Sequence, residues 1–408
     1  MSALEFAPTQ AGTALPDPPQ PLPDPSQSLA EVAAELGERA AAPNADAVDA
    51  DGRFPAEAMA AIRAAGLLGA LVPQRWGGPG HSMTEYAEAV TALAQHCATS
   101  GLILAMHGIQ VACIVRHAEP ATLERVVPGL LSGQLLLANA NSEVGLYGER
   151  RSSICALEPT ADGYRLEKRA STVSYGEFAD GVLATARRSP DSPPSEQVFA
   201  ICLPPHMRLE PNGDWDTLGL RGTCSRPCLL TAELTPDLVI DNYAEVFAET
   251  SLAASAILLS SVWRGIAEAA ARRAHTSVRS QARKLRAANP DAPPPTSALR
   301  LAELTVVLHQ IRAIIAYGAA EYERVKDTPA VSTIGFSAMM DSVKLTSSTL
   351  VGDIVRQAMG ICGLAGYANN SPASLGRLVR DAAAAPLMVN NDRALVAAAQ
   401  SLLLRKDL

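Results

Sequence analysis

Apolar side chains recur at helical spacing through the first third of the chain. Between residues 29 and 131, Ala, Leu and Val return every three or four positions, as on the buried face of an amphipathic helix. Pro55 suits the first turn of a helix, and Ser82 followed by Glu85 forms a capping-box pattern. We therefore expect a helical domain over residues 29–133.

The hydrophobic period becomes shorter after residue 133. Short runs typical of β-strands follow, separated by turn dipeptides such as Asp162-Gly163 and Asn212-Gly213. The expected strands cover residues 134–140, 153–157, 164–174, 181–186, 197–203 and 228–234. Their regular spacing predicts a small β-sheet or β-barrel domain over residues 134–240.

Long helical patterns rich in Ala and Leu return after residue 240. They cover residues 250–275, 298–326, 337–360 and 391–404, with a Pro-rich insert at 289–295. Such a run of long helices predicts a bundle over residues 241–408. The expected fold class is therefore α+β and multidomain: an N-terminal helical domain, a small middle β-domain and a C-terminal helical bundle.

Composition narrows the class of function. The net charge of −8 argues against a nucleic-acid surface, and seven Cys in 408 residues do not indicate a disulfide scaffold. Polar residues interrupt the apolar runs and no secretory signal is evident, so we expect a cytoplasmic protein with neither a membrane nor a nucleic-acid partner. Residues 1–28 are dense in Pro, Asp and Ser, which predicts a disordered tail.

Common catalytic motifs are absent from the sequence. It contains no P-loop, HExxH, CxxC pair or GxSxG, so neither a metal site nor a nucleophile elbow is predicted. Residues 360–367, GICGLAGY, form a glycine-rich turn between two expected helices. Such glycines allow close approach either of a phosphate group or of another chain segment, and both interpretations stay open.

Five segments, read together and in chain order, resemble the motifs of the acyl-CoA dehydrogenase superfamily. They are residues 65–68 (AGLL) with 73–80 (PQRWGGPG), 139–145 (NANSEVG), 166–180 (LEKRASTVSYGEFAD), 215–225 (WDTLGLRGTCS), and 358–367 (AMGICGLAGY) with 380–382 (RDA). The matches cover nearly the whole chain from about residue 30. The order of domains predicted above is also the order in this family.

The resemblance implies an FAD enzyme that forms a homodimer or homotetramer. The flavin would lie between the β-domain and the C-terminal helices, partly those of a neighbouring subunit. Asn141, Ser142 and Gly145 would flank the isoalloxazine through backbone contacts, Ser174 would place a hydroxyl near flavin N5, and Thr172 replaces an aromatic residue that often stacks beside the ring. The other implied contacts are Gly363, Ala365 and Gly366 at the FAD pyrophosphate, and Arg279 or Arg283 at a phosphate.

One feature of the family is missing. Its dehydrogenases remove the α-proton of an acyl thioester with a Glu carboxylate and pass a hydride to flavin N5. The usual loop for that Glu reads PLMVNNDR here, at residues 386–393, and the alternative helix position holds Ser255. Asp392 and His107 are titratable groups that could replace it, but Asp392 could equally cap the last helix and His107 could equally be a satisfied core residue. The residues expected to line the substrate pocket are Gln110, Ser255, Asn390 and Asn391.

Three functions therefore stay open. The first is dehydrogenation of an acyl thioester, on CoA or a carrier protein, with electrons passing to an acceptor flavoprotein. The second is a flavin monooxygenase or oxidase, in which reduced flavin meets O2 and no α-proton base is needed. The third is a subunit that keeps the fold for assembly without chemistry of its own. The loop at residues 146–150, LYGER, departs from the family's GSD pattern, so the carrier of the substrate is open as well.

Overall fold

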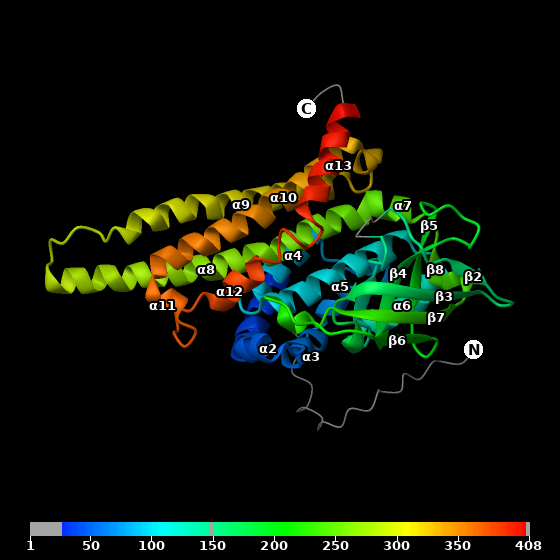
Figure 1. The fold of residues 1–408 in the computed structure, drawn as a ribbon, viewed down its shortest axis with the longest axis horizontal. Helices are drawn as coiled ribbons and strands as arrows, with labels where there is room; N and C mark the ends of the chain where they lie inside the picture. The colour runs from blue at the N-terminus through cyan, green and yellow to red at the C-terminus, as the bar shows by residue number, and fades with distance from the viewer. Residues whose placement is uncertain (1–26, 147–150, 405–408) are drawn as a thin grey trace.

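The computed structural model describes residues 27–146 and 151–404. Helices, then strands, then helices follow one another along the chain, and Figure 1 shows them as three adjoining parts. This arrangement confirms the expected fold class. Most of the tail predicted to be disordered, and four residues of the loop at 146–150, lie outside the described residues.

The N-terminal part is helical, and its longest helix is almost entirely buried. Its helices are α1 (Leu29–Leu36), α2 (Ala45–Asp51), α3 (Ala56–Ala64), α4 (Met83–Ala94), α5 (Ala98–His117) and α6 (Pro120–Leu131). The capping box is confirmed, because the Ser82 hydroxyl accepts the Glu85 N–H at 3.2 Å and the Glu85 carboxylate accepts the Ser82 N–H at 2.8 Å. By length and composition α5 and the helical run 243–288 could each cross a membrane, but 89% and 78% of their apolar windows are buried. Both therefore serve as core helices of this fold.

The β-domain consists of two four-stranded sheets in the described part of the chain. Its strands are β1 (Leu137–Ala140), β2 (Leu157–Pro159), β3 (Tyr164–Val173), β4 (Gly181–Arg187), β5 (Gln197–Cys202), β6 (Met207–Pro211), β7 (Arg226–Leu234) and β8 (Val239–Ile240). The strand orders are β1-β4-β5-β8 and β2-β3-β7-β6. β1 pairs with β4 in parallel, whereas β3 and β7 form the longest antiparallel ladder.

The strand expected at residues 153–157 is wrong. A strand begins only at Leu157, because the Glu143 carboxylate accepts the N–H groups of Ile154 at 3.0 Å and Cys155 at 2.6 Å, and these groups cannot then join a ladder. The sequence also predicted neither β6 nor β8. β8 has two residues, which is too short for a hydrophobic period to be visible, whereas the five residues of β6 alternate between apolar and charged side chains and carried a signal that was overlooked.

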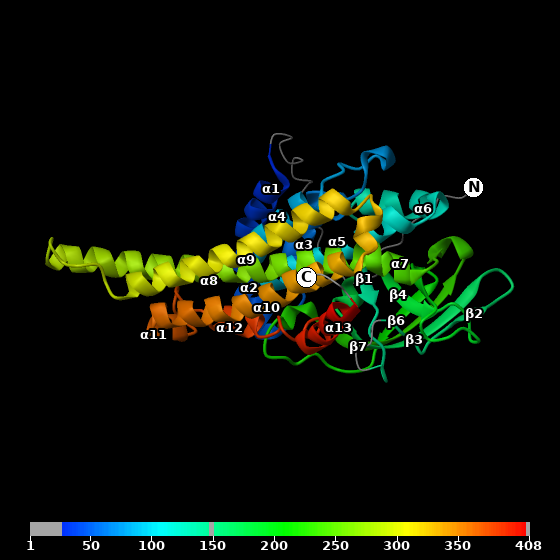
Figure 2. The same cartoon turned by 90° about the horizontal axis from the view of Figure 1, so that it is seen from above.

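The C-terminal part is a bundle built on three long helices. α8 (Leu252–Ala288), α9 (Ser297–Val325) and α10 (Ile334–Cys362) lie side by side, and the tip of the α8–α9 hairpin projects away from the β-domain (Figures 1 and 2). The shorter elements are α7 (Tyr243–Val246), the π-helix η8 (Phe247–Ser251), α11 (Leu364–Tyr367), α12 (Gly376–Ala382) and α13 (Asn391–Leu404). The first long helix extends beyond the expected 250–275, because α7, η8 and α8 are continuous and end only at the Pro-rich insert.

The RDA segment connects all three parts. The buried Asp381 carboxylate accepts the Leu220 N–H at 2.7 Å, which ties α12 to the WDTLGLRGTCS segment. A Cβ atom on Gly219 would overlap the Arg380 carbonyl oxygen, so only glycine allows this approach. The Arg380 guanidinium pairs with Asp49 of α2. The two motifs therefore lock the β-domain between the bundle and the N-terminal helices.

Candidate functional site

The loop after β1 carries the first group of expected flavin contacts. The Ser142 hydroxyl donates to the Thr172 carbonyl oxygen at 2.9 Å and accepts the Thr172 N–H at 3.1 Å, which fixes this loop to the end of β3. Asn141 donates from Nδ2 to the Tyr243 hydroxyl at 3.3 Å, while its buried Oδ1 has no hydrogen-bond partner among the described residues. Gly145 has a φ of +97°, a conformation that favours glycine. The structure thus brings Asn141, Ser142 and Thr172 together in one loop region and leaves the Asn141 Oδ1 as a buried acceptor without a partner among the described residues.

A row of hydroxyl groups lies between β3 and β7. Ser174 and Ser225 are joined by a hydrogen bond of 2.8 Å between their hydroxyls, and Ser225 and Thr223 by a second of 2.8 Å. Thr223 donates onward to the Leu220 carbonyl oxygen at 2.8 Å. The row fixes the position of Ser174, the residue expected near flavin N5. Hydroxyl groups both donate and accept, and Asn141 Oδ1 accepts, so the chemistry of these groups suits the polar edge of an isoalloxazine, which presents both donors and acceptors.

His107 does not have the geometry of a catalytic base. Its side chain is fully buried in α5, its Nε2 lies 2.9 Å from the Leu68 carbonyl oxygen, and its Nδ1 accepts the Leu137 N–H at 3.0 Å. A carbonyl only accepts and an amide N–H only donates, so these partners fix the neutral tautomer with the proton on Nε2. Burial lowers the pKa of His107 to about 4. Because both ring nitrogens are occupied by backbone groups, His107 attaches β1 to α5, and this geometry favours the interpretation of a satisfied core residue over that of a base.

Asp392, the other candidate base, lies at the surface of the described chain. Its side chain is exposed in the first turn of α13. Nor does it cap the helix, because Asn390 does so: the Asn390 Oδ1 accepts the N–H groups of Asp392 at 3.0 Å and Arg393 at 3.2 Å. The structure therefore places this carboxylate at the surface of the chain and gives Asn390 a structural partner.

Asn391, the half-buried first residue of α13, lies in the segment where the family's Glu is expected. Its Oδ1 accepts hydrogen bonds from Lys344 Nζ and, at 3.0 Å, from the Ser348 hydroxyl. Lys344 is buried in α10, and its ammonium lies 5.9 Å from the centre of the Trp263 ring. An amide held by a cation stands here in place of a free carboxylate. The sequence did not single out Lys344, because a lone Lys within a helical pattern carries no signal of burial.

Gln110 and Ser255 are the pocket residues expected on the two helices that meet beside this region. Gln110 is buried in α5, and its Oε1 has no hydrogen-bond partner among the described residues, while its Nε2 donates to the Met106 carbonyl oxygen at 3.2 Å. Ser255 is half-buried near the start of α8. An unpaired buried acceptor is costly unless a bound group completes it, so Gln110 is well suited to hold a donor.

The remaining expected flavin contacts lie at the opposite end of the bundle. Gly363, Ala365 and Gly366 are at the end of α10 and in α11, and Gly363 lies about 28 Å along the helix axis from Lys344. Arg279 and Arg283 are exposed on the distal part of α8. In one chain the structure therefore does not bring these residues together with Asn141 and Ser174.

A buried ion pair was not identified from the sequence. It lies beneath the loop after β1 that carries Asn141 and Ser142, called the flavin-site loop below. The Lys168 ammonium is fully buried and lies 3.2 Å from the Glu143 carboxylate and 2.7 Å from the Thr185 carbonyl oxygen. Glu143 follows Ser142 directly, so the pair supports the loop that carries Asn141 and Ser142. The ion pair could have been found from the sequence, because Glu143 and Lys168 lie within the motifs at residues 139–145 and 166–180.

Two family models match this chain. The N-terminal domain of acyl-CoA dehydrogenase matches residues 23–134, and the C-terminal domain matches residues 245–388.

Curated relatives include enzymes of different chemistry. An L-prolyl-[peptidyl-carrier protein] dehydrogenase of Pseudomonas fluorescens is 32% identical over 142 residues, which are 34% of this chain and 37% of that protein. The amino sugar nitrososynthase DnmZ of Streptomyces peucetius is 25% identical over 358 residues, which are 83% of this chain and 84% of that protein.

Solved structures of the same fold include a dibenzothiophene monooxygenase, TdsC, and an acyl-CoA dehydrogenase. FMN-bound TdsC from Paenibacillus sp. A11-2 has a TM-score of 0.79 at 22% identity, covering 92% of this chain and 97% of that one. Butyryl-CoA dehydrogenase from Megasphaera elsdenii has a TM-score of 0.79 at 20% identity, covering 94% and 99%. The fold, the motifs and the family models agree: the chain belongs to the acyl-CoA dehydrogenase family, whose members are flavin oxidoreductases.

Proposed function

We propose that this chain is a flavin-dependent monooxygenase or oxidase that uses reduced flavin and O2. The observation that carries the proposal is the chemistry of His107 and Asn391. His107 is neutral and bonded on both nitrogens, and the amide of Asn391 stands in the loop that carries the family's base. Removal of an α-proton needs an available base, whereas transfer of electrons from reduced flavin to O2 does not.

The cofactor we propose is FAD, with FMN as the alternative. When bound and reduced, the flavin would supply the two electrons that reduce O2. Asn141, Ser142 and Ser174 would hold the ring, and Thr172 would leave room beside it. The turn from Gly363 to Gly366, exposed at Gly363 and Ala365, would contact the pyrophosphate of FAD bound in a second copy, which makes a homodimer or homotetramer part of the proposal. Binding of FMN alone would leave this turn without that role.

The residues of this chain would act on the substrate by binding and orientation. Gln110 Oε1 is a buried acceptor that would receive a donor group of the substrate, and the Ser255 hydroxyl lies on the facing helix. Lys344 and Ser348 fix Asn391, and so determine which part of its amide can reach a ligand. His107 would act as a positioning residue that holds β1 in place. A cytoplasmic location remains a prediction.

Dehydrogenation of an acyl thioester is the second candidate. It is favoured by the 32% identity to the L-prolyl-[peptidyl-carrier protein] dehydrogenase over 142 residues. The substrate would then be held on a carrier protein or on CoA, and an electron-transfer flavoprotein would accept the electrons. Of the two bases proposed from the sequence, only Asp392 has a side chain without a hydrogen-bond partner among the described residues, and it would have to reach the substrate from the surface of the chain.

An anaerobic titration separates the two candidates. The protein is loaded with FAD, and separately with FMN, and mixed with a panel of acyl-CoA and acyl-carrier-protein thioesters. We expect the oxidised flavin band to persist with every thioester and to disappear with an external NADH-dependent flavin reductase.

The Asp392→Asn variant sharpens this test. Under the proposed function it behaves as the wild type in both arms. Bleaching of the flavin by a thioester, abolished in Asp392→Asn, would overturn the proposal and establish the dehydrogenase. A protein that binds neither flavin would instead indicate the assembly subunit.

A further inference from the structure

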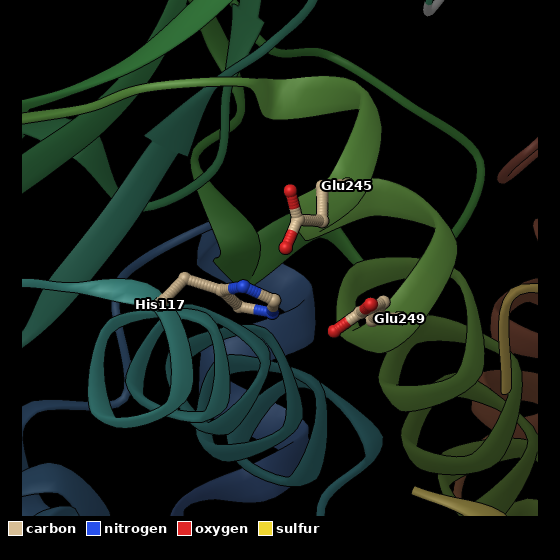
Figure 3. A group of neighbouring side chains, drawn as sticks. All are labelled: His117, Glu245 and Glu249. Carbon is tan, nitrogen blue, oxygen red and sulfur yellow. The ribbon is translucent and has the colours of Figure 1, made fainter. Parts of the chain in front are cut away.

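A second polar cluster lies at the far end of α5, about 15 Å along the helix from His107. It consists of His117, the last residue of α5, with Glu245 of α7 and Glu249 of η8. One donor atom of each side chain lies within 4.8 Å of those of the other two. Figure 3 shows the imidazole and the two carboxylates pointing toward one another from two separate elements.

The local backbone explains why these groups meet. Glu245 and Glu249 are four residues apart on one continuous helical run, so they share a face. His117 reaches that face from α5, and its Nε2 is hydrogen-bonded at 2.8 Å to the hydroxyl of Thr250, which is fully buried. A hydrogen bond of this kind from one ring nitrogen typically orients a metal-binding histidine.

The two carboxylates are incompletely neutralised. Glu245 accepts a hydrogen bond from Asn242 Nδ2 at 2.9 Å and has no ion-pair partner among the described residues. Glu249 lies 3.8 Å from the Arg116 guanidinium, which is closer, at 2.8 Å, to Asp327. One cation is therefore shared, and the cluster keeps an excess of negative charge.

Solvent reaches the cluster from two sides. A hollow of about 270 Å³ is lined by His117 and Glu245 together with Glu119 and Asp241. A second hollow, of about 550 Å³, is lined by Glu249 and Arg116. The three side chains thus line hollows through which an ion and its water ligands would reach them.

We propose that His117, Glu245 and Glu249 bind one divalent transition-metal ion, for which Zn²⁺ fits best. One imidazole nitrogen and two carboxylate oxygens are ordinary zinc ligands, and the imidazole disfavours Mg²⁺ and Ca²⁺. Donor atoms around Zn²⁺ are roughly 3 to 3.5 Å apart, so the exposed Glu245 has to move inward by a rotamer change of modest size.

The site would join two parts of the molecule. His117 belongs to the N-terminal helical part and both Glu residues to the C-terminal part, so a bound ion would link them. The role is structural, and it does not depend on the reaction at the flavin. No motif signalled it, because the histidine and the two carboxylates are far apart in the sequence.

The test uses the full chain, stripped with EDTA, and titrates Zn²⁺ against a chromophoric chelator. We expect the wild type to bind one tight equivalent and to gain in melting temperature with Zn²⁺. Glu245→Gln should weaken this equivalent by about tenfold or more and lose the gain. Glu245 is exposed, so this variant is expected to fold.

Glu119→Gln is the matched control, since Glu119 lines the same hollow outside the three ligands. It should bind as the wild type does. The chain has seven free cysteines, and all remain in both variants, so zinc held by cysteine would be unaffected by Glu245→Gln. No tight equivalent in the wild type, or equal affinity in the wild type and Glu245→Gln, would overturn the proposal and leave the Arg116–Glu249 ion pair as the only role of the cluster.

Discussion

The β-domain end and the α11 end of the molecule hold the two groups of expected flavin contacts, and they differ in how far one chain completes them. At the β-domain end, buried polar groups are largely satisfied within the chain: Lys168 by Glu143, and Asp381 by the Leu220 N–H. At the α11 end, Leu364 and Tyr367 are 86% and 76% exposed around the glycine turn. Folding therefore satisfies most buried polar groups of the first region, with Asn141 Oδ1 as an exception, whereas the second region has an apolar surface that folding does not cover.

The largest loss of stability is expected when the buried Glu143–Lys168 ion pair of the β-domain is broken. Glu143→Gln leaves the Lys168 ammonium buried without its anion, which typically lowers the free energy of unfolding by about 3–5 kcal/mol. Urea denaturation measures this loss. Glu167→Gln on the same strand as Lys168 is the control, because its pair with Arg165 is exposed and loses only about 0.5 kcal/mol. Equal effects of the two variants would show that the buried pair does not support the flavin-site loop.

A smaller effect concerns the junction at Asp381. Burial raises the pKa of this carboxyl to about 6, above its ordinary value. The folded chain therefore binds more protons than the unfolded chain between about pH 4 and 6, and the contribution of Asp381 to stability falls as the pH rises through this window.

Asp381→Asn keeps an acceptor for the Leu220 N–H but cannot ionise. Relative to the wild type, its free energy of unfolding should therefore rise between pH 4 and 6, by about 3 kcal/mol at most. Denaturation curves recorded across this range measure the difference. A difference that does not change with pH would show that the carboxyl ionises normally in the folded protein.

The smallest effect on stability is expected at the α11 end. Leu364→Asp alters a side chain with almost no contacts inside the chain, so the free energy of unfolding should change by about 0.5 kcal/mol or less. If a second copy covers this surface, the same variant lowers the molar mass measured by light scattering and weakens FAD binding. An unchanged mass and an unchanged FAD affinity would show that the two ends do not meet in an assembly.

The fold was largely predictable because periodicity and capping signals are local. Ser82 and Glu85 mark a helix start from four residues, and α13 has the predicted bounds. The strand at 153–157 was not predictable, because a side chain ten or more positions earlier, Glu143, binds its backbone N–H groups.

The site was predictable only in part. The family motifs located Asn141, Ser142, Thr172 and Ser174 in the β-domain, and the structure brings Ser142 and Thr172 into contact, while Ser174 is bonded to Ser225. The state of His107 was not accessible, since it depends on Leu68 and Leu137, which are distant in the sequence and contribute only backbone atoms. The different surroundings of Asn390, Asn391 and Asp392 were not accessible either, because helix geometry rather than residue type decides that Asn391 is the half-buried one.

The most direct test of the proposed function is the reaction of the reduced, flavin-loaded protein with O2 in a stopped-flow instrument. This measurement needs no knowledge of the substrate. We predict that the bound reduced flavin is reoxidised by O2 at least as fast as free reduced flavin at the same oxygen concentration. A bound flavin that O2 reoxidises more slowly than free flavin, and that an acyl thioester reduces anaerobically, would contradict it.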